Sequence, residues 1–371
     1  DVWVDTFIPG GQRVTICTCS RTGRHLDTFT RRPESSLYGL TTVSAQVAEA
    51  GQVAASSQVS VSGQLAASCS CRVLSHQTLL WHHRLSHPSL PHLCGMHTRL
   101  LVSGIPRSLP SLPRSPAPPC LPCVEGRQCA APHSSEFPPT TAPPTTAPLQ
   151  TLHMDVWGPG PVGGMDQERY FLLVVDDYTR YTTVFPLRCK ANVSGVLIPW
   201  IRATRRQLRE RFSRDFPVLR LFSDRGGEFS SDLLAEFCQD EGIVQSFTFP
   251  ASLHQNGIAE HHIGLIMEVA RTSMIHATAP HILWPFAVRY AAHQLNLWPH
   301  VSKPETSPTL RWTGKVGDAS VFWVWGTLSL VCDTKANKLS SRTLCCIFLG
   351  FPIDTPPWQF YHPRSHRVFS S

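Results

Sequence analysis

Three acidic residues lie where a metal-dependent nuclease would need them. Asp155 follows the run Leu-His-Met, Asp224 follows an apolar run that ends at Ser223, and Glu260 stands in the first turn of an expected helix. Strand ends and a helix start can meet at one edge of a sheet, where three carboxylates repel one another unless cations bind. Magnesium, or manganese in its place, prefers such oxygen ligands. The pattern predicts two ions that assist displacement at a phosphodiester, although each acid taken alone is more often a turn or solvated residue.

A second set of side chains has the spacing of a structural zinc site. His82 and His87 have four residues between them, and Cys120 and Cys123 have two. Two histidines and two thiolates can close a tetrahedron around one zinc ion. Spacing alone leaves four other ligands open: His83, His92, Cys94 and Cys129. It also leaves open that the histidines cover a polar helix face while the cysteines lie free in a proline-rich coil.

A basic run lies in the second half of the chain. Its six arginines are Arg202, Arg205, Arg206, Arg209, Arg211 and Arg214. Such a run is commonly a solvated helix face, but beside a carboxylate site it can hold phosphates without sequence preference. The net charge of +7 is compatible with a polyanionic partner.

Composition narrows the class of protein. No run of about 18 apolar residues and no basic-then-apolar leader occurs, so we expect an intracellular protein with no membrane span. In that reducing setting the 13 cysteines favour metal sites over disulfides. The first residue is Asp1 rather than Met, which suggests a fragment or a processed piece of a polyprotein.

The elements that would position the acids follow an α/β order. Strands are expected at residues 152–156, 170–176 and 181–186, then a helix at 191–212 that contains Pro199, and then a strand, a helix and a strand at 218–223, 231–241 and 244–249. Two helices follow at 256–276 and 281–297. Short strands come last, at 321–324, 345–349 and 358–362. The order is that of a ribonuclease-H-like core, although other α/β folds share it.

Around that core the sequence divides into further segments. Residues 1–76 read as a poorly ordered region with short β-like runs and an insert, because Gly-Gln-Val-Ala-Ala-Ser at Gly51 recurs as Gly-Gln-Leu-Ala-Ala-Ser at Gly63. The expected domains are a zinc-binding segment at 77–127, a proline-rich linker at 128–148, the catalytic core at 149–312 and a truncated small β-barrel at 313–371.

The motifs around the three acids resemble one family. Asp155 stands in His-Met-Asp-Val-Trp-Gly-Pro, Asp224 in Ser-Asp-Arg-Gly-Gly-Glu-Phe and Glu260 in His-Gln-Asn-Gly-Ile-Ala-Glu, with 35 residues between the last two acids. These resemble, in order and spacing, the signature blocks of copia-type retrotransposon integrases. Leu80-Trp-His-His-Arg-Leu-Ser-His resembles the zinc-binding segment that precedes the family's core, and Cys346-Ile-Phe-Leu-Gly-Phe resembles its SH3-like barrel.

The resemblance implies a function. The chain would process the 3′ ends of element DNA and join them to target DNA, with Asp155, Asp224 and Glu260 holding two Mg²⁺ ions and with one Zn²⁺ on His82, His87, Cys120 and Cys123. It implies self-association and a location in the nucleus and in cytoplasmic virus-like particles. The candidate DNA contacts are Arg202, Arg205, Arg206, Arg209, Arg225, Gln255 and Asn256.

Several positions depart from the family pattern. Arg225 replaces a usual Asn and is able to pair with a catalytic carboxylate. The Lys or Arg that usually follows the glutamate is absent, because His261-His-Ile-Gly stands there, and Ser86 replaces a common Gly. Two alternatives therefore stay open: a ribonuclease-H-like nuclease that only hydrolyses, and a degenerate or co-opted copy that binds nucleic acid without catalysis.

Overall fold

The computed structural model divides the chain into two compact units, Asp1–Cys71 and Arg72–Ser371. In the first unit it describes four strands; in the second it describes residues 76–106, 120–127, 145–248, 256–299, 304–332, 342–352 and 358–370. The repeat at 51–68, most of the proline-rich tract, Cys129 and Gln255 lie outside the described residues. None of the described helices is long and apolar enough to cross a membrane.

The first unit contains a four-stranded antiparallel sheet. Its strands are β1 (Val2–Ile8), β2 (Gln12–Thr18), β3 (His25–Arg31) and β4 (Tyr38–Leu40), paired in chain order. The β-like run Arg13–Ile16 of the sequence lies inside β2. The N-terminal region thus contains a sheet within its first 40 residues, where the sequence predicted little order.

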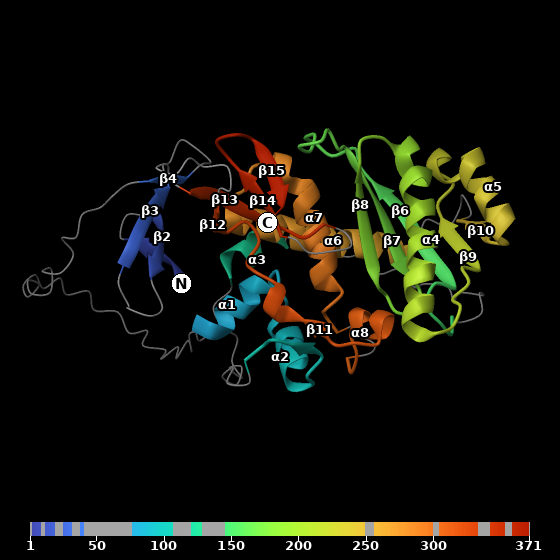
Figure 1. Ribbon diagram of the computed structural model, residues 1–371, viewed down its shortest axis with the longest axis horizontal. Coiled ribbons are helices and arrows are strands. Elements are labelled where there is room, and N and C mark those ends of the chain that lie inside the picture. The colour runs from blue at the N-terminus through green and yellow to red at the C-terminus, as the bar shows by residue number, and fades with distance from the viewer. Residues whose placement is uncertain are drawn as a thin grey trace, which may run out of the picture. The chain divides into compact units, whose positions relative to one another are not determined.

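The centre of the second unit is a mixed five-stranded sheet with the order β10-β9-β6-β7-β8. The strands β6 (Thr151–Trp157), β7 (Tyr170–Asp176) and β8 (Thr182–Leu187) are antiparallel neighbours, whereas β9 (Arg220–Ser223) and β10 (Val244–Phe247) add in parallel beside β6. Parallel additions need crossovers, and the helices supply them (Figure 1). This strand order confirms the predicted ribonuclease-H-like core.

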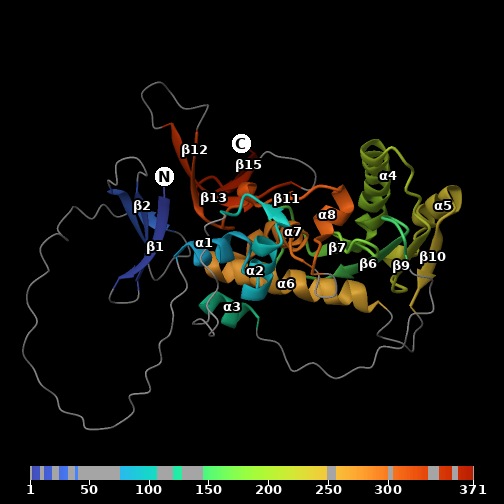
Figure 2. The ribbon, with the colours of Figure 1, turned by 90° about the horizontal axis from the view of Figure 1, so that it is seen from below.

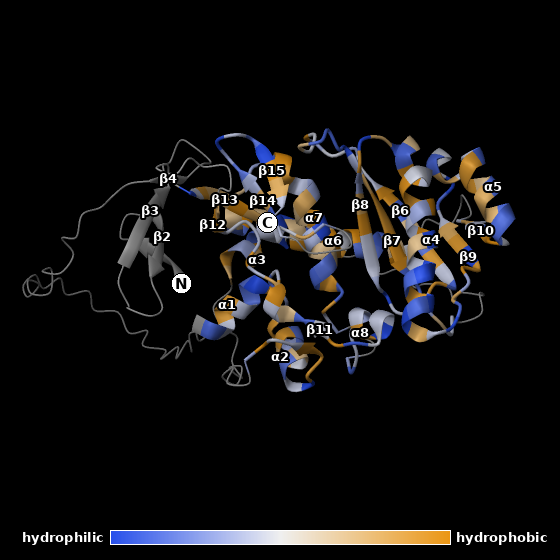
Figure 3. Cartoon of the chain, viewed as in Figure 1, coloured by the Kyte–Doolittle hydropathy of each residue, from blue (hydrophilic) through white to orange (hydrophobic). Residues whose placement is uncertain are grey.

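Helices cover both faces of this sheet. On one face lie α4 (Val193–Phe212), which contains Pro199, and α5 (Asp232–Glu241); on the other lie α6 (Gly257–Ala277) and α7 (Trp284–Leu295). Short 3-10 turns lead into them at η1 (Lys190–Asn192), η2 (Gly227–Phe229) and η3 (His281–Leu283). Because both faces are covered, β7 is buried along nearly its whole length, and the strands are coloured mainly as hydrophobic in Figure 3.

The segment that precedes the sheet packs on the α6 face. It consists of α1 (His76–Arg84), α2 (Leu90–Thr98), β5 (Val102–Ser103) and α3 (Leu121–Gly126). The chain breaks between α1 and α2, because Ser86 and His87 adopt positive φ before Pro88, and Ser89 caps α2. Figure 2 shows α6 as one long helix that runs from the sheet to α3.

The C-terminal region contains α8 (Pro308–Thr313), β11 (Gly317–Asp318), η4 (Ala319–Val321) and an antiparallel sheet. That sheet is formed by β12 (Leu328–Cys332), β13 (Thr343–Gly350), β14 (Gln359–His362) and β15 (Arg367–Ser370), in chain order. The two-residue strand β11 pairs in parallel with β5. One apolar core joins this region, the α6 face and the first segment, from Trp81 to Tyr361.

The strand predicted at 321–324 is wrong. Its backbone groups bond to side chains instead of a neighbouring strand: Phe322 O accepts from Arg84 Nε at 2.8 Å, and Trp323 O accepts from the Tyr290 hydroxyl at 2.6 Å. The run is apolar because Phe322 is buried in the shared core. Side chains thus supply the hydrogen bonds that a neighbouring strand would otherwise supply to these backbone carbonyl groups.

Candidate active site and metal centre

Asp155 lies on β6 and faces α6. Along this strand Leu152 and Met154 pack toward α4, whereas Trp157 packs beside Trp284 of α7. Side chains alternate along a strand, so Asp155 shares the face of Trp157. Its Oδ1 accepts a hydrogen bond from Val156 N at 2.7 Å.

Asp224 directly follows β9, the parallel neighbour of β6. Its Oδ1 accepts from Gly226 N at 3.0 Å, which closes a tight loop before η2. Gly226 fits this loop because a Cβ there would stand 2.7 Å from the Glu228 carboxyl carbon. The Asp224 carboxylate therefore lies just beyond the end of β9, at the same edge of the sheet as Asp155.

Glu260 lies exposed in the first turn of α6. The start of that helix is tied to β6, because Asn256 Nδ2 donates to Met154 O at 2.9 Å, one residue before Asp155. Asn256 is only 3% exposed, so the predicted DNA contact is replaced by this structural one. An open depression in the surface is lined by both Asp155 and Glu260, with Trp157 and Ile263 beside them.

The electrostatics of Asp155 connect the three acids. Its pKa is raised to about 6, first by burial and then by the negative charges of Asp224 and Glu260. Because Asp155 and Glu260 line one depression and Asp224 follows the strand beside β6, the structure places all three predicted carboxylates at one edge of the sheet. They are not gathered tightly: among the described residues, the ligating groups that lie within 4.8 Å of one another are those of a histidine and cysteine cluster elsewhere.

Lys190 is a charged neighbour of the site that the sequence reasoning missed. Its Nζ lies 2.7 Å from Glu228 Oε1, and the Glu228 side chain is only 6% exposed. The Lys190 charge lowers the pKa of Asp155, against the larger effects that raise it. Its position in η1, between β8 and α4, gave no local signal, because its approach to Glu228 depends on how the strands are ordered in the sheet.

The predicted zinc ligands meet in a second cluster. His82 Nε2 and His87 Nδ1 are 3.2 Å apart, Cys123 Sγ is 3.3 Å from His82 Nε2 and 3.4 Å from His87 Nδ1, and Cys120 Sγ is 3.5 Å from His87 Nδ1. A tetrahedral zinc with bonds of about 2.0 Å to nitrogen and 2.3 Å to sulfur sets its ligand atoms roughly 3.3–3.8 Å apart. These printed distances fit that ion, and the ligating atoms of His83, together with those of His82, His87 and Cys120, also lie within 4.8 Å of one another.

The surroundings of this cluster favour the protonation states in which histidine and cysteine bind a metal. His82 Nδ1 donates to Pro88 O at 3.0 Å, which leaves Nε2 free to face the sulfur atoms. Burial lowers the pKa of His87 to about 4, so that imidazole is neutral at neutral pH. The hydrogen bond from Cys123 lowers the pKa of the Cys120 thiol. His83 also lies close, with Nε2 3.9 Å from Cys120 Sγ. Two competing ligands are described on α2: His92, which stacks on Trp298, and Cys94, which is a half-buried free thiol.

Parts of the chain are similar in sequence to known proteins. Residues 145–252 match the family model described as "Integrase core domain". The chain is 27% identical over 304 residues to the retrovirus-related Pol polyprotein from transposon RE2 of Arabidopsis thaliana, covering 81% of this chain and 19% of that protein. It is 28% identical to the corresponding polyprotein from transposon TNT 1-94 of Nicotiana tabacum, over 62% of this chain and 17% of that protein. The chain thus spans about a fifth of the length of these curated relatives.

Residues 145–252 thus match an integrase core domain, and the chain is similar to copia-like retrotransposon polyproteins.

Among solved structures, the chain is also similar to the HTLV-2 integrase catalytic core domain in complex with magnesium. The match has 16% identity and a TM-score of 0.32, and it covers 44% of this chain and 97% of that one.

The arginine run is not at the carboxylate edge of the integrase core. Five of its arginines lie in the second half of α4 and Arg214 lies just beyond the helix, whereas Lys190 precedes the first turn. Since each residue advances a helix by about 1.5 Å, the run lies well away from the end near Lys190. Arg205 pairs with Glu241 at 2.6 Å, and Arg202 lies over the Phe237 ring. Arg206 and Arg209 are exposed. Arg225 is exposed beside Asp224, but in the described part of the chain it forms no ion pair with a carboxylate.

Two further acids of the integrase core, Asp176 and Asp177, have structural partners. Asp176 is 1% exposed and accepts from Leu149 N and from Thr179. Burial raises the pKa of Asp177, but hydrogen bonds from His153 and Thr145 and the Arg180 charge outweigh it, so the net change is a lowered pKa. These acids lie at the far end of β7 from the Asp155 edge.

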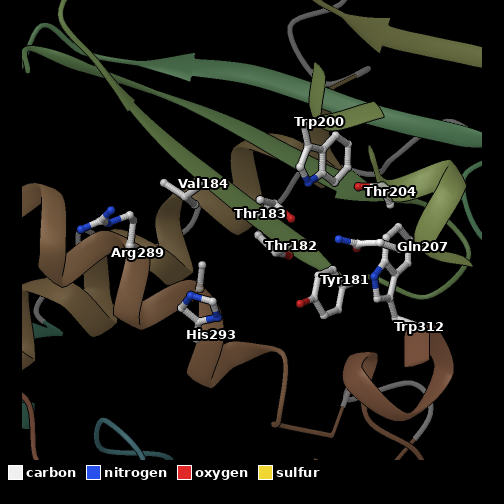
Figure 4. Close-up of a pocket in the computed structure, with 11 residues that line it drawn as sticks. Tyr181, Thr182, Thr183, Val184, Trp200, Thr204, Gln207, Arg289, His293 and Trp312 are labelled. Carbon is white, nitrogen blue, oxygen red and sulfur yellow. The ribbon is translucent and has the colours of Figure 1, made fainter. Parts of the chain in front are cut away.

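A more enclosed cavity lies along the outer edge of β8, between α4 and α7. Figure 4 shows Thr182 and Thr183 on its floor, with Trp200, His293 and Trp312 around it. Trp312 closes one end by stacking on Tyr181, with ring centroids 4.8 Å apart. None of the predicted site residues lines this cavity.

Proposed function

We propose that this chain is a retrotransposon integrase that processes the 3′ ends of element DNA and transfers them to a target. The observation that carries this proposal is the meeting of Asp155, Asp224 and Glu260 from two parallel neighbouring strands and one helix start. Burial first, and then the negative charges of Asp224 and Glu260, raise the pKa of Asp155, and a bound cation would relieve that repulsion. Carboxylate oxygens are also the donor set that Mg²⁺ prefers.

The roles of the residues follow from their positions. Asp155, Asp224 and Glu260 would hold two Mg²⁺ ions, which supply charge stabilisation to the attacking and leaving oxygens of a phosphodiester. Asn256 keeps Glu260 beside β6, and Gly226 lets Glu228 fold back toward Lys190. The open depression leaves room for a nucleic-acid backbone, because it is shallow and faces solvent.

Two chemical steps are proposed at this one site. In the first, water attacks a phosphodiester near the element end, and the strand beyond it leaves, so a 3′ hydroxyl is exposed. In the second, that hydroxyl attacks a phosphodiester of the target; one phosphorus–oxygen bond forms as another breaks, and the target's own 3′ oxygen leaves with a proton. The bond count is unchanged in the second step, so no energy source is needed.

We propose that zinc at His82, His87, Cys120 and Cys123 is structural. Four protein ligands close the coordination shell and leave no open position for substrate. The C-terminal strands β12 to β15 form an antiparallel meander, which supports the proposal of a small SH3-like barrel. The proposed partners are element DNA ends, target DNA and further copies of this chain, in the nucleus and in cytoplasmic virus-like particles.

The test is an end-joining assay with a labelled duplex that ends in the element's own terminal sequence. With Mg²⁺ we expect a shortened labelled strand and products longer than the substrate, and chelation should remove both. Shortening without longer products would replace this proposal with a hydrolysing nuclease. Binding of the duplex with neither product would replace it with a copy that has lost catalysis.

A further inference from the structure

The His/Cys cluster touches the helix that carries Glu260. His87 turns its Nδ1 toward the sulfur atoms, whereas its other nitrogen, Nε2, lies 3.0 Å from Nδ1 of His276. His276 belongs to the last turn of α6 and is 9% exposed. The His83 ring packs edge-on against it, with centroids 4.2 Å apart. A ligand of the proposed zinc therefore reaches α6 through its outward-facing nitrogen.

This contact lies within a close interface along the same half of α6. Ser273 Oγ donates to Ser86 Oγ at 3.2 Å, next to His87. A Cβ on Gly126 would stand 2.8 Å from Thr272 Cα, so α3 approaches the helix as closely as only glycine permits. The segment that holds the cysteines is thereby pressed onto α6.

Charged groups add to the interface. Arg127 Nε pairs with Glu268 at 3.0 Å, and another nitrogen of Arg127 donates to His87 O. Arg271 Nη1 donates to Gly126 O at 2.9 Å. Three consecutive turns of α6 thus hold the residues on either side of the zinc ligands.

One helix therefore connects two sites. α6 has 21 residues, which gives a length of about 30 Å, with Glu260 in its first turn and His276 in its last. Between these ends Ile266, Val269 and Ala270 are buried in the shared core, so the middle of the helix packs against that core. We therefore expect that a contact which orders the last turns of α6 also orders the rest of the helix.

We propose that His276 is a positioning residue for the zinc site: it holds the outer nitrogen of His87 and couples metal loading to the order of α6. A histidine ligand is fixed in tautomer and orientation by the group that binds its second nitrogen, and loss of such a partner typically weakens metal binding about 10- to 100-fold. In the proposed arrangement His87 Nε2 carries the proton and donates it to His276 Nδ1, which leaves the His87 Nδ1 lone pair for the metal. This inference rests on the zinc site proposed above.

The first measurement is zinc affinity of the full chain, by competition with a chromophoric chelator. We expect His276→Ala to bind zinc about 10- to 100-fold more weakly. His276→Gln keeps an acceptor oxygen in reach and should recover part of that loss. The control is His281→Ala, which removes an exposed histidine five residues further on and should leave the affinity within about twofold.

The second measurement is amide hydrogen exchange in α6, with and without zinc. Zinc should slow exchange in α6 of the wild type and of His281→Ala, and it should do so much less in His276→Ala. A purely packing role for His276 would lower the melting temperature but leave the zinc affinity and this protection unchanged, and that result would overturn the coupling.

The outcomes separate the two proposals. If the wild type binds no zinc, both the zinc site and the coupling fail. If the wild type binds zinc and His276→Ala binds it equally well, only the coupling fails. Should His276→Ala not fold, His276→Gln and the zinc-dependent exchange of the wild type decide, because unchanged exchange on zinc addition contradicts the coupling by itself.

Discussion

The two candidate metal sites of this unit differ in how far they are assembled. Around His82 and Cys123 the ligating atoms already lie 3.2–3.5 Å apart, and outer hydrogen bonds fix the rings. At the carboxylate edge, Asp224 and Glu260 are exposed, and the three acids influence one another through charge. The first arrangement suits an ion that holds a fold. The second suits ions that arrive with their substrate and whose remaining ligands are water and phosphate oxygens.

The contrast also appears in the pKa values of the acids. Asp155, raised to about 6, carries a charge that the fold does not stabilise. Asp177 has its pKa lowered by donors built around it. A carboxylate whose charge costs stability is a candidate for function, and one with a lowered pKa is a candidate for structure.

The largest expected effect is at the carboxylate edge. Glu260→Gln keeps the shape of the side chain but removes its charge, so Mg²⁺-dependent processing and joining should fall by at least about 100-fold while zinc content and melting temperature stay unchanged. Glu236→Gln makes the same change at an exposed position of α5 and should retain activity. Activity that survives Gln at 260 would remove this site from the mechanism.

At the His/Cys cluster we expect a loss of zinc and of stability, the two properties that Glu260→Gln should leave unchanged. Cys120→Ser combined with Cys123→Ser should lower zinc from one ion per chain to none and cost several kcal/mol of folding stability, because metal affinity is part of the folding free energy. Metal analysis and thermal unfolding measure the two effects. Cys332→Ser with Cys345→Ser, two exposed thiols of the C-terminal sheet, is the matched control. Unchanged zinc content in the first double variant would make the ligand assignment wrong.

An intermediate effect should separate a structural acid from the functional ones. A lowered pKa means that Asp177 stabilises the fold above its unfolded pKa of about 4, and that this contribution is lost as the pH falls below it. Asp177→Asn should therefore cost about 1–2 kcal/mol of unfolding free energy at pH 7 and clearly less at pH 3. Denaturant unfolding at both pH values measures this, with Asp240→Asn on exposed α5 as control. An equal loss at both pH values would contradict the charge argument.

The smallest effect concerns how far the DNA surface extends beyond the carboxylates. Replacing Arg202, Arg206 and Arg209 with Gln should flatten the slope of log affinity against log salt by roughly two to three units if each contacts a phosphate. Arg205→Gln should change the slope less, because Arg205 is already paired with Glu241. An unchanged slope in the triple variant would return the second half of α4 to an ordinary solvated face.

Local patterns predicted most of the core. The strands β6, β7 and β8 lie within about a residue of their expected bounds, because their apolar runs are bounded by turn residues such as Asp177 and Arg180. The three acids and the two His/Cys pairs were found by motif and spacing. Their meeting follows from the strand order, which the order of elements already indicated.

What the sequence could not supply depends on long-range packing. Nothing near Lys190 indicates Glu228, and nothing near His276 indicates His87, since each pair joins distant parts of the chain. The arginine run looked relevant to the acids because it is near them in sequence, but the direction of α4 carries it away from their edge. At 321–324 an apolar run was taken for a strand, whereas Arg84 and Tyr290 hold its backbone.

The Arg84 contact has a consequence for how this unit is made. The guanidinium lies 4.4 Å from the Trp81 ring centroid and 4.9 Å from that of Trp323, and Arg84 bonds to Phe322 O across 238 positions. At the usual rate of translation, Phe322 leaves the ribosome roughly 10 to 50 seconds after Arg84. Throughout that interval Trp81 on the nascent helix α1 lacks Phe322, a later residue of the same apolar core. A segment that is synthesised early is thus completed late, and a chaperone that shields apolar nascent chains should bind it during that wait.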